Sequence, residues 1–393
     1  MYKNILFRTS KLHKQNSKTT TMEETNHMKS LKRVHISKPP FEYSDLKKAV
    51  PPHCFKHSLF RSFKSLFRDI FIMCTLFYIS INYIPLLPKP ISYVVWPIYW
   101  SFQAVIFGGI WGIGHECCLR GFTGRQWLDD PIGFLILTCL LTPYYSMKFS
   151  HRTHHAHTNS IEYDEIHVPK LNDDKLYSKV LNNRIGVILQ ILFNLTFGWS
   201  AYLFFNYTGR KYEGIASHFY PNSRIFNDSE RGLIFLSDIG IFVALYGYYR
   251  IAMAKGVFWA INVFGLPLFL MCSLLMFLTY LQHTHPSIAH YDSTEWNWMR
   301  GALSTIDRDV GFLNYFVHDL PRIHVLHHLF PTIPHYHAIE ALEAVKPILG
   351  EYYNYDDTFI LKAFWREMKE CIYVESDDGE KKGGVYWYKN KIK

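Results

Sequence analysis

The feature that most constrains the fold of this chain is a series of six long apolar segments, separated by polar sequence that is rich in histidine. A helix needs about 20 apolar residues to cross a bilayer, and buried helices of soluble proteins rarely run this long without a charge. Asp238 is the only charged residue within the segments. We therefore predict an integral membrane protein. The segments cover residues 70–87, 91–113, 132–147, 185–206, 233–249 and 257–281.

Composition supports this class of protein. Of the 393 residues, 49% are hydrophobic and 17% are aromatic, which excludes a disordered chain. The seven cysteines are too few for a disulfide scaffold. Apart from the adjacent pair Cys117 and Cys118 they are scattered singly, as expected in a reducing setting.

The basic surplus of the chain lies at its N-terminus. The first 68 residues contain 15 Lys or Arg and four Asp or Glu, whereas the net charge of the whole chain is +9. An excess of Lys and Arg beside a first membrane helix predicts a cytosolic flank over residues 1–69, and no nucleic-acid-binding surface is expected. Phe60, Phe63 and Phe67 suggest that the flank lies on anionic lipid, with a solvated basic tail as the alternative.

The two ends of the chain carry candidate targeting signals. Residues 1–21 are rich in Ser, Thr and Lys and lack acids, as in a transit peptide, and Met22 and Met28 offer later starts. Residues 1–21 therefore need not belong to the mature protein, and no cleavable signal peptide is expected. Lys389 and Lys391 have the spacing of a dilysine signal for retrieval to the endoplasmic reticulum, which is read in the cytosol. We predict a membrane domain over residues 70–393 with a cytosolic C-terminal tail.

Histidine supplies the candidate chemistry. The pattern H-x-x-H-H occurs at residues 151–155 and 324–328, whereas 21 His in 393 residues would give it roughly 0.06 times by chance. Positions i, i+3 and i+4 share one face of a helix, and neutral imidazole binds iron, zinc and copper. Six imidazoles exceed the needs of one tetrahedral zinc ion, and no H-E-x-x-H motif occurs. We predict a two-metal site in which iron activates dioxygen to attack an unactivated C–H bond. Its predicted ligands are His151, His154, His155, His324, His327 and His328.

Shared metals would place both motifs on one side of the membrane. Three apolar segments separate the motifs, so an even number of these segments must span. We predict that segments 233–249 and 257–281 form a spanning hairpin, that 185–206 lies in the interface, and that 132–147 is in-plane or re-entrant. Arg250 and Lys255 would then lie in a lumenal turn, against the positive-inside tendency. The predicted fold is an all-α membrane protein with four transmembrane helices and interfacial helices under a cytosolic, His-rich di-iron cap.

Several stretches in a fixed order make the chain resemble the plant-type microsomal fatty acid desaturases. The likeness is to the oleate Δ12 (omega-6) group and its divergent hydroxylase and acetylenase relatives, and it covers residues 35–390. The stretches are QWLDD at 126–130, SHRTHHAHTN at 150–159, TYLQHTHP at 279–286, HYDSTEWNW at 290–298, RGALSTIDRDVG at 300–311, HVLHHLFPTIPHYH at 324–337 and KECIYV at 369–374.

This resemblance implies an O2-dependent enzyme with two non-haem iron ions, which introduces a double bond into fatty acyl chains esterified in phospholipid. It also implies electrons from cytochrome b5 and its NADH-dependent reductase. The chain contains no His-Pro-Gly-Gly haem motif, so the cytochrome is expected to be a separate partner. The family's second and third histidine boxes fall on the two H-x-x-H-H motifs. A further ligand is expected between them at His283, with His285 as the alternative.

Other polar residues at family positions have more modest interpretations. Four carboxylates either brace ligand imidazoles or are solvated or helix-capping groups; they are Asp129, Asp130, Asp307 and Asp309. We interpret three further histidines as stabilising residues rather than spare ligands; they are His157, His335 and His337.

The first histidine box departs from the family pattern H-[DE]-C-G-H-H. The sequence reads HECCLR at 115–120, so His115 is kept as a ligand while Leu119 and Arg120 replace the two later histidines. Leu119 cannot bind a metal, and the permanent charge of Arg120 would repel one. We therefore expect at least one iron ion to be bound more weakly. Cys118, one turn after His115, could replace a lost ligand as a thiolate.

Two functions follow from this departure. In the first, the protein is an active desaturase, or a hydroxylase or acetylenase of the same group. In the second, it is a catalytically silent member that forms homo- or hetero-oligomers with desaturases in the same membrane. The first predicts about two iron ions per chain, and the second predicts one or none.

Overall fold

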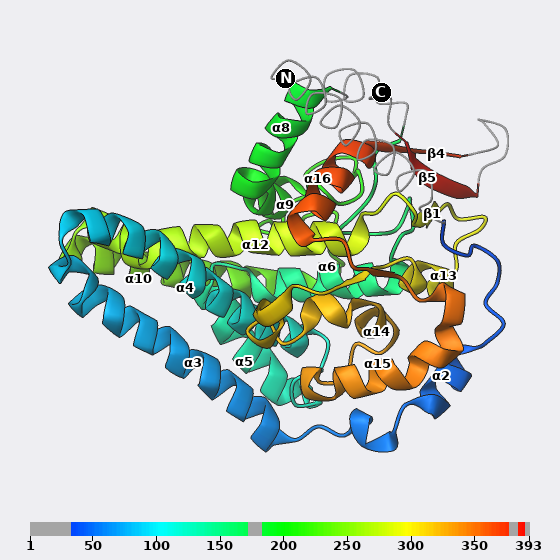
Figure 1. The fold of residues 1–393 in the computed structure, drawn as a ribbon, viewed down its shortest axis with the longest axis horizontal. Helices are drawn as coiled ribbons and strands as arrows, with labels where there is room; N and C mark the ends of the chain where they lie inside the picture. The colour runs from blue at the N-terminus through cyan, green and yellow to red at the C-terminus, as the bar shows by residue number, and fades with distance from the viewer. Residues whose placement is uncertain (1–32, 172–182, 377–383, 390–393) are drawn as a thin grey trace, which may run out of the picture.

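A computed structural model describes residues 33–171, 183–376 and 384–389 (Figure 1). The transit-like segment, the later starts and the final four residues lie outside the described residues. The described chain is mostly helical. Its helices are α2 (Tyr43–Ala49), α3 (Leu59–Asn82), α4 (Lys89–Cys118), α5 (Gln126–Cys139), α6 (Tyr144–His157), α8 (Arg184–Phe193), α9 (Trp199–Phe205), α10 (Arg231–Lys255), α11 (Val257–Ala260), α12 (Leu266–His283), α13 (Trp298–Leu303), α14 (His324–Leu329), α15 (His335–Leu349) and α16 (Ile360–Glu370).

The long apolar helices α3, α4, α10 and α12 form the extended part of the molecule (Figure 1). Large apolar side chains cover their outer surfaces: Phe71 of α3 and Phe242 of α10 are both more than 70% exposed. Such a surface suits lipid rather than water. Among the described residues, five stretches are long and apolar enough to cross a membrane: Leu59–Leu86, Lys89–Cys118, Arg184–Phe205, Asp228–Lys255 and Val257–His283.

The apolar segments 185–206 and 132–147 differ in geometry from the long helices α3, α4, α10 and α12. α8 is steeply inclined to α12 and lies near α16, and a π-helical turn at Asn194–Gly198 joins α8 to α9 (Figure 1). α5 and α6 are bent by 110° relative to each other, as in a broken span or a re-entrant loop. The bend falls after Leu141, whose φ of 53° lies in the left-handed region. The apolar segment 132–147 is therefore divided between two helices.

The prediction of a helical fold is confirmed for most of the described residues, but the described C-terminal part also contains two small sheets that the prediction omitted. The first has the order β1–β5–β4, with both pairs antiparallel, and in the second β2 and β3 run parallel. These strands are too short to show a period-two pattern, and β1 pairs with a strand about a hundred residues later, so no local signal revealed them. The strands are β1 (Ala289–Tyr291), β2 (Asp307–Arg308), β3 (Tyr355–Asp356), β4 (Tyr373–Ser376) and β5 (Val385–Lys389).

The described part of the basic flank packs against the C-terminal helices. Glu42 and Asp45 form a capping box that starts α2, each side chain accepting the backbone N–H of the other residue. Phe41 and Leu46 are buried in an apolar cluster with residues of α14 and α15, including Leu326. Residues 41–54 therefore belong to the folded unit that surrounds the third histidine box.

Helix α4 is the central helix of the membrane part, and it packs against α3, α5 and α12. The second half of α4 is almost entirely buried. At Gly109 the helix approaches the chain around Phe316 so closely that an added Cβ would overlap the Phe316 carbonyl oxygen. Glycine is required here for space, since the backbone oxygen cannot rotate away.

We expect Gly109→Ala to destabilise the protein by about 1–3 kcal/mol, because overpacking against backbone forces the helices apart. The midpoint of thermal unfolding in detergent should fall by several degrees. Gly247→Ala in α10 is the matched control, since an added Cβ there meets nothing within 4 Å. Equal midpoints for the two variants would contradict this close approach.

Candidate metal centre

Four helices bring the histidines of the sequence motifs together. α6 carries residues 151, 154 and 155, and α14 carries residues 324, 327 and 328. α4 and α12 contribute one histidine each near their C-terminal ends, at His115 and His283. All eight predicted ligands are buried. The two motifs therefore lie together, as the prediction that they share metals requires.

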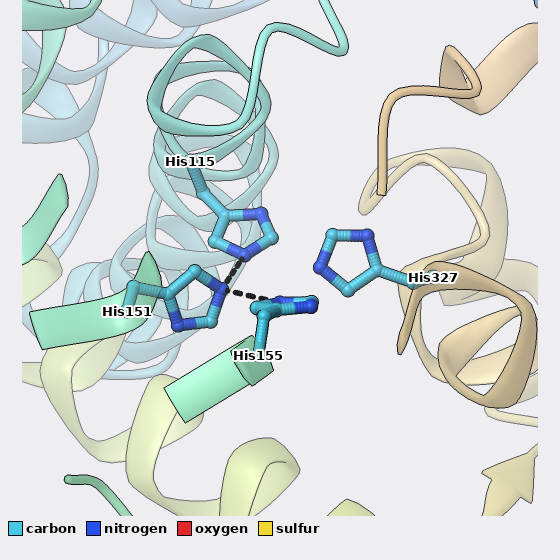
Figure 2. Close-up of side chains that lie close together, drawn as sticks. All are labelled: His115, His151, His155 and His327. Carbon is cyan, nitrogen blue, oxygen red and sulfur yellow. Dashed lines mark hydrogen bonds between the residues drawn. The ribbon is translucent and has the colours of Figure 1, made fainter. Parts of the chain in front are cut away.

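The first cluster contains His115, His151, His155 and His327, and their rings gather around a common point (Figure 2). One candidate ligand atom from each ring lies within 4.8 Å of those of the other three. The Nε2 atoms of His115 and His151 are 2.6 Å apart, and those of His151 and His155 are 3.0 Å apart. His327 completes the cluster: the centroid of its imidazole lies 4.6 Å from that of His155 and 4.8 Å from that of His115.

The second cluster contains His154, His283, His324 and His328. Nε2 of His283 lies 3.3 Å from Nε2 of His154 and 2.9 Å from Nε2 of His324. His324 and His328 are linked in the same way at 3.2 Å. The second cluster thus contains the residue between the motifs that the family resemblance favoured.

Helical geometry explains why each motif serves both clusters. Residues i and i+4 are about 40° apart around a helix, whereas neighbouring residues are about 100° apart. In α6, His151 and His155 accordingly share the first cluster, while His154 points into the second. In α14, His324 and His328 share the second cluster, while His327 points into the first.

The donor atoms suit metal ions held by neutral nitrogen. Burial and the neighbouring imidazoles hold the pKa values of His324, His327 and His328 well below their usual range, so these rings keep free lone pairs at neutral pH. Nε2 of His327 is buried and has no hydrogen-bond partner among the described residues. An unpartnered buried nitrogen costs about 1–3 kcal/mol, and a bound cation would remove that cost. Two groups of four imidazoles fit a pair of iron ions.

Two side chains outside the clusters orient ligand rings. Asp164 lies in the loop after α6, and its Oδ1 is 2.6 Å from Nδ1 of His154. Despite its burial, His154 and the backbone N–H groups of Ile166 and Asn159 hold the pKa of Asp164 below its usual range. Oγ1 of Thr158 lies 3.0 Å from Nδ1 of His328. Each contact leaves Nε2 of the ligand ring directed into the second cluster.

The four carboxylates noted in the sequence have other partners. Asp129 accepts hydrogen bonds from Thr123, Asp130 binds Tyr144 and Lys148, and Asp309 accepts from Asn314. Asp307 accepts the backbone N–H of Val325 at 2.7 Å, so it supports α14 rather than a ligand ring. Asp164 was missed because a single carboxylate in a loop has no spacing that relates it to His154.

The alternative ligand His285 lies outside both clusters. Its Nδ1 is 2.6 Å from Oγ of Ser287, and its Nε2 is 3.6 Å from Asp356. Asp356 also pairs with Arg308 and Arg366, two permanent cations whose charge disfavours a metal ion at His285. His157 and His335 likewise bond elsewhere, to the Thr153 carbonyl and to Glu116.

The altered first box ends outside the clusters. α4 ends at Cys118, and Arg120 follows with a φ of 60° and an exposed side chain whose Nη2 donates to Gln126 at 2.7 Å. Sγ of Cys118 is 3.5 Å from the Gly114 carbonyl of its own helix, which does not support the thiolate replacement. Both groups of four imidazoles form without residues 119 and 120.

An apolar cavity leads to the clusters. Trp111, Met147, Trp199 and Met276 line it together with cluster histidines. His167 also lines the cavity and stacks on His283 with ring centroids 4.7 Å apart. Burial lowers the pKa of His167 to about 3, so it is a neutral polar group in an apolar wall. Sequence reasoning missed His167 because it stands alone in a loop.

Comparison with known proteins extends these observations. Residues 93–359 match the family model described as fatty acid desaturase. The chain is 60% identical to fatty acid conjugase FAC2 A of Calendula officinalis, over 93% of this chain and 98% of the relative. It is 52% identical to an omega-6 fatty acid desaturase, endoplasmic reticulum, of Brassica juncea, over 92% and 95%. It is 51% identical to a Delta(12)-fatty-acid desaturase of Arabidopsis thaliana, over 95% and 97%.

We expect His327→Ala and His328→Ala each to remove one of about two iron ions per chain, because each ring belongs to a different cluster. The double variant should bind almost none. Iron is measured by mass spectrometry on protein purified in detergent. His157→Ala is the control from the same region, since His157 bonds to the Thr153 carbonyl of its own helix and stacks on Trp296. Full iron content in His327→Ala would contradict the first cluster.

We expect Asp164→Asn to weaken the second site by about 10–100-fold, because the amide does not fix the His154 ring as the carboxylate does. Iron retained during competition with a chelator should fall toward one ion per chain. Asp129→Asn, a buried carboxylate bonded to Thr123, should retain iron as the wild type does. Equal retention in the two variants would show that Asp164 does not position His154.

Proposed function

The chain belongs to the fatty acid desaturase family, and from this premise we propose that it is an O2-dependent acyl-lipid desaturase with two iron ions in the two histidine clusters. The reaction removes two hydrogens from neighbouring methylene groups and leaves a carbon–carbon double bond. Dioxygen takes up these two hydrogens, two electrons and two protons, and two water molecules form. The eight buried imidazoles at the end of an apolar cavity are the observation that carries this proposal.

In this proposal some residues of the chain hold the metal ions and others bind the substrate. Bound iron would supply, with dioxygen, the oxidising power that breaks an unactivated C–H bond. Asp164 and Thr158 hold the rings of His154 and His328 in position. The apolar cavity wall around Trp111 would bind the acyl chain, exclude water and select the carbon that lies nearest the clusters.

The membrane arrangement follows from the same site. α3, α4, α10 and the segment ending in α12 would span, with α8 and α9 in the interface and α5–α6 re-entrant. This arrangement brings all four ligand-bearing helices to one face, which we propose is the cytosolic face of the endoplasmic reticulum. Both termini would lie on the same side. Cytochrome b5 and its NADH-dependent reductase would supply the two electrons there.

The names of the relatives suggest two candidate products for the reaction of this chain. The relatives of Brassica juncea and Arabidopsis thaliana are named an omega-6 and a Delta(12) fatty acid desaturase, so a Δ12 double bond in phospholipid-linked acyl chains is the first candidate product. The higher identity to the conjugase of Calendula officinalis, 60% against 52%, favours conjugated double bonds as a second candidate. The two reactions differ in which hydrogens of the acyl chain lie beside the clusters, so one metal centre serves either.

Expression in yeast with analysis of total fatty acids tests this function. We expect a new dienoic or conjugated acyl chain in the phospholipids, and the ultraviolet absorbance of conjugated double bonds separates the two products. Cells are also fed the dienoic acid that a conjugating enzyme would use. His327→Ala, which lacks a ligand of the first cluster, should give no product.

The altered first box supplies the decisive comparison. Leu119→His with Arg120→His should leave the product unchanged, because neither position reaches the described clusters. No product from well-expressed wild type, with product restored by the double substitution, would overturn the proposal. The silent membrane-partner function would then hold.

A further inference from the structure

A third group of metal-binding side chains lies where the N-terminal flank meets α15, outside the two histidine clusters. His53 and Cys54 lie in the 3-10 turn Pro52–Phe55, and His337 and Glu340 lie in the first turns of α15. We propose that these four residues bind a single zinc ion, which fastens the flank to the cap. Neither the sequence motifs nor the comparisons with relatives assign a role to this group.

The geometry of the group is close to that of a four-coordinate site. One ligand atom from each residue lies within 4.8 Å of those of the other three. Nε2 of His53 is 2.9 Å from Oε1 of Glu340, and Nδ1 of His337 is 3.8 Å from Oε2 of the same residue. Ligand atoms around a tetrahedral zinc ion lie about 3.3–3.8 Å apart. Small side-chain rotations therefore bring all four atoms to bonding distance.

The chemical types of the four ligands select the metal. One sulfur, two imidazole nitrogens and one carboxylate oxygen are all ligands that zinc accepts in tetrahedral sites. Calcium and magnesium require oxygen ligands, and the single carboxylate cannot supply them. The set also differs from the two clusters of the metal centre, which contain imidazole alone. Zinc and iron are thus expected to occupy separate sites.

The group of four side chains has a buried side and a side that is open to solvent. Cys54 is fully buried within the apolar cluster around α14 and α15, and it forms the floor. The side chains of His53 and Glu340 are each 52% exposed, so an ion could enter between them from solvent. The His337 side chain is 12% exposed and closes one side. The sequence favoured a stabilising role for His337 over a role as ligand, and the zinc proposal instead makes it a ligand.

The position of the group suggests what zinc would do. Val50 and Cys54 pack in the same apolar cluster as Leu326 and Leu329, which lie on α14 beside the ligand imidazoles. A zinc ion bound only by the folded chain would stabilise this packing by mass action. The consequence is a cap whose inner wall, next to the third histidine box, is held from outside by a second kind of metal.

Metal analysis of the full-length protein tests the proposal. The protein is purified in detergent with a tag that lacks histidine, incubated with one equivalent of Zn²⁺ and desalted. We expect about one zinc per chain in the wild type and less than about one tenth in His53→Ala and Cys54→Ser. Iron content should be the same in all three proteins. Because His53 is half exposed, His53→Ala should fold even if Cys54→Ser does not.

Two controls and a spectroscopic measurement complete the design. His57→Ala, three residues after Cys54 and bonded instead to the Thr332 carbonyl, and Cys74→Ser, an exposed cysteine of α3, should both bind zinc normally. Co²⁺ in place of zinc should give a thiolate charge-transfer band that Cys54→Ser abolishes. Wild type without zinc, or equal zinc in wild type and His53→Ala, would each overturn the proposal. None of these results would depend on desaturase activity.

Discussion

The convergence of eight imidazoles in a buried space is the constraint on which the rest of the structure depends. Bringing so many nitrogen atoms together without a cation leaves hydrogen-bonding groups unpaired, as Nε2 of His327 shows. Helix geometry makes the convergence possible, because each H-x-x-H-H motif directs rings to two sides at once. The loop carboxylate of Asp164 then fixes the direction of one ring.

The apolar helices serve this site as a frame. α4 and α12 each place one ligand near the C-terminal end, so the site lies where these two helices end together. Close packing at Gly109 holds α4 against the chain that leads into α14. The flank and α15 enclose the site from the other side, with Leu46 and Leu326 in a common apolar cluster. The geometry of the clusters therefore also depends on packing contacts made by residues that do not belong to the clusters.

Much of the site could be predicted from the sequence, because helical spacing is a local signal. The structure brings all eight predicted ligands together, including His283. The partners Asp164, Thr158 and His167 could not be predicted, since loops relate residues by tertiary folding and not by a period. The small sheets could not be predicted for the same reason, because tertiary folding pairs residues as distant in sequence as Ala289 and Trp387. The 110° bend between α5 and α6 was anticipated only as a re-entrant segment.

Adjacent residues of one helix belong to different clusters: His154 and His155 do so in α6, and His327 and His328 do so in α14. Covalent backbone on both sides would therefore fix the spacing of two metal ions bound in these clusters. Such ions would keep the same separation when their oxidation state or their small ligands change, because the two helices would set that separation.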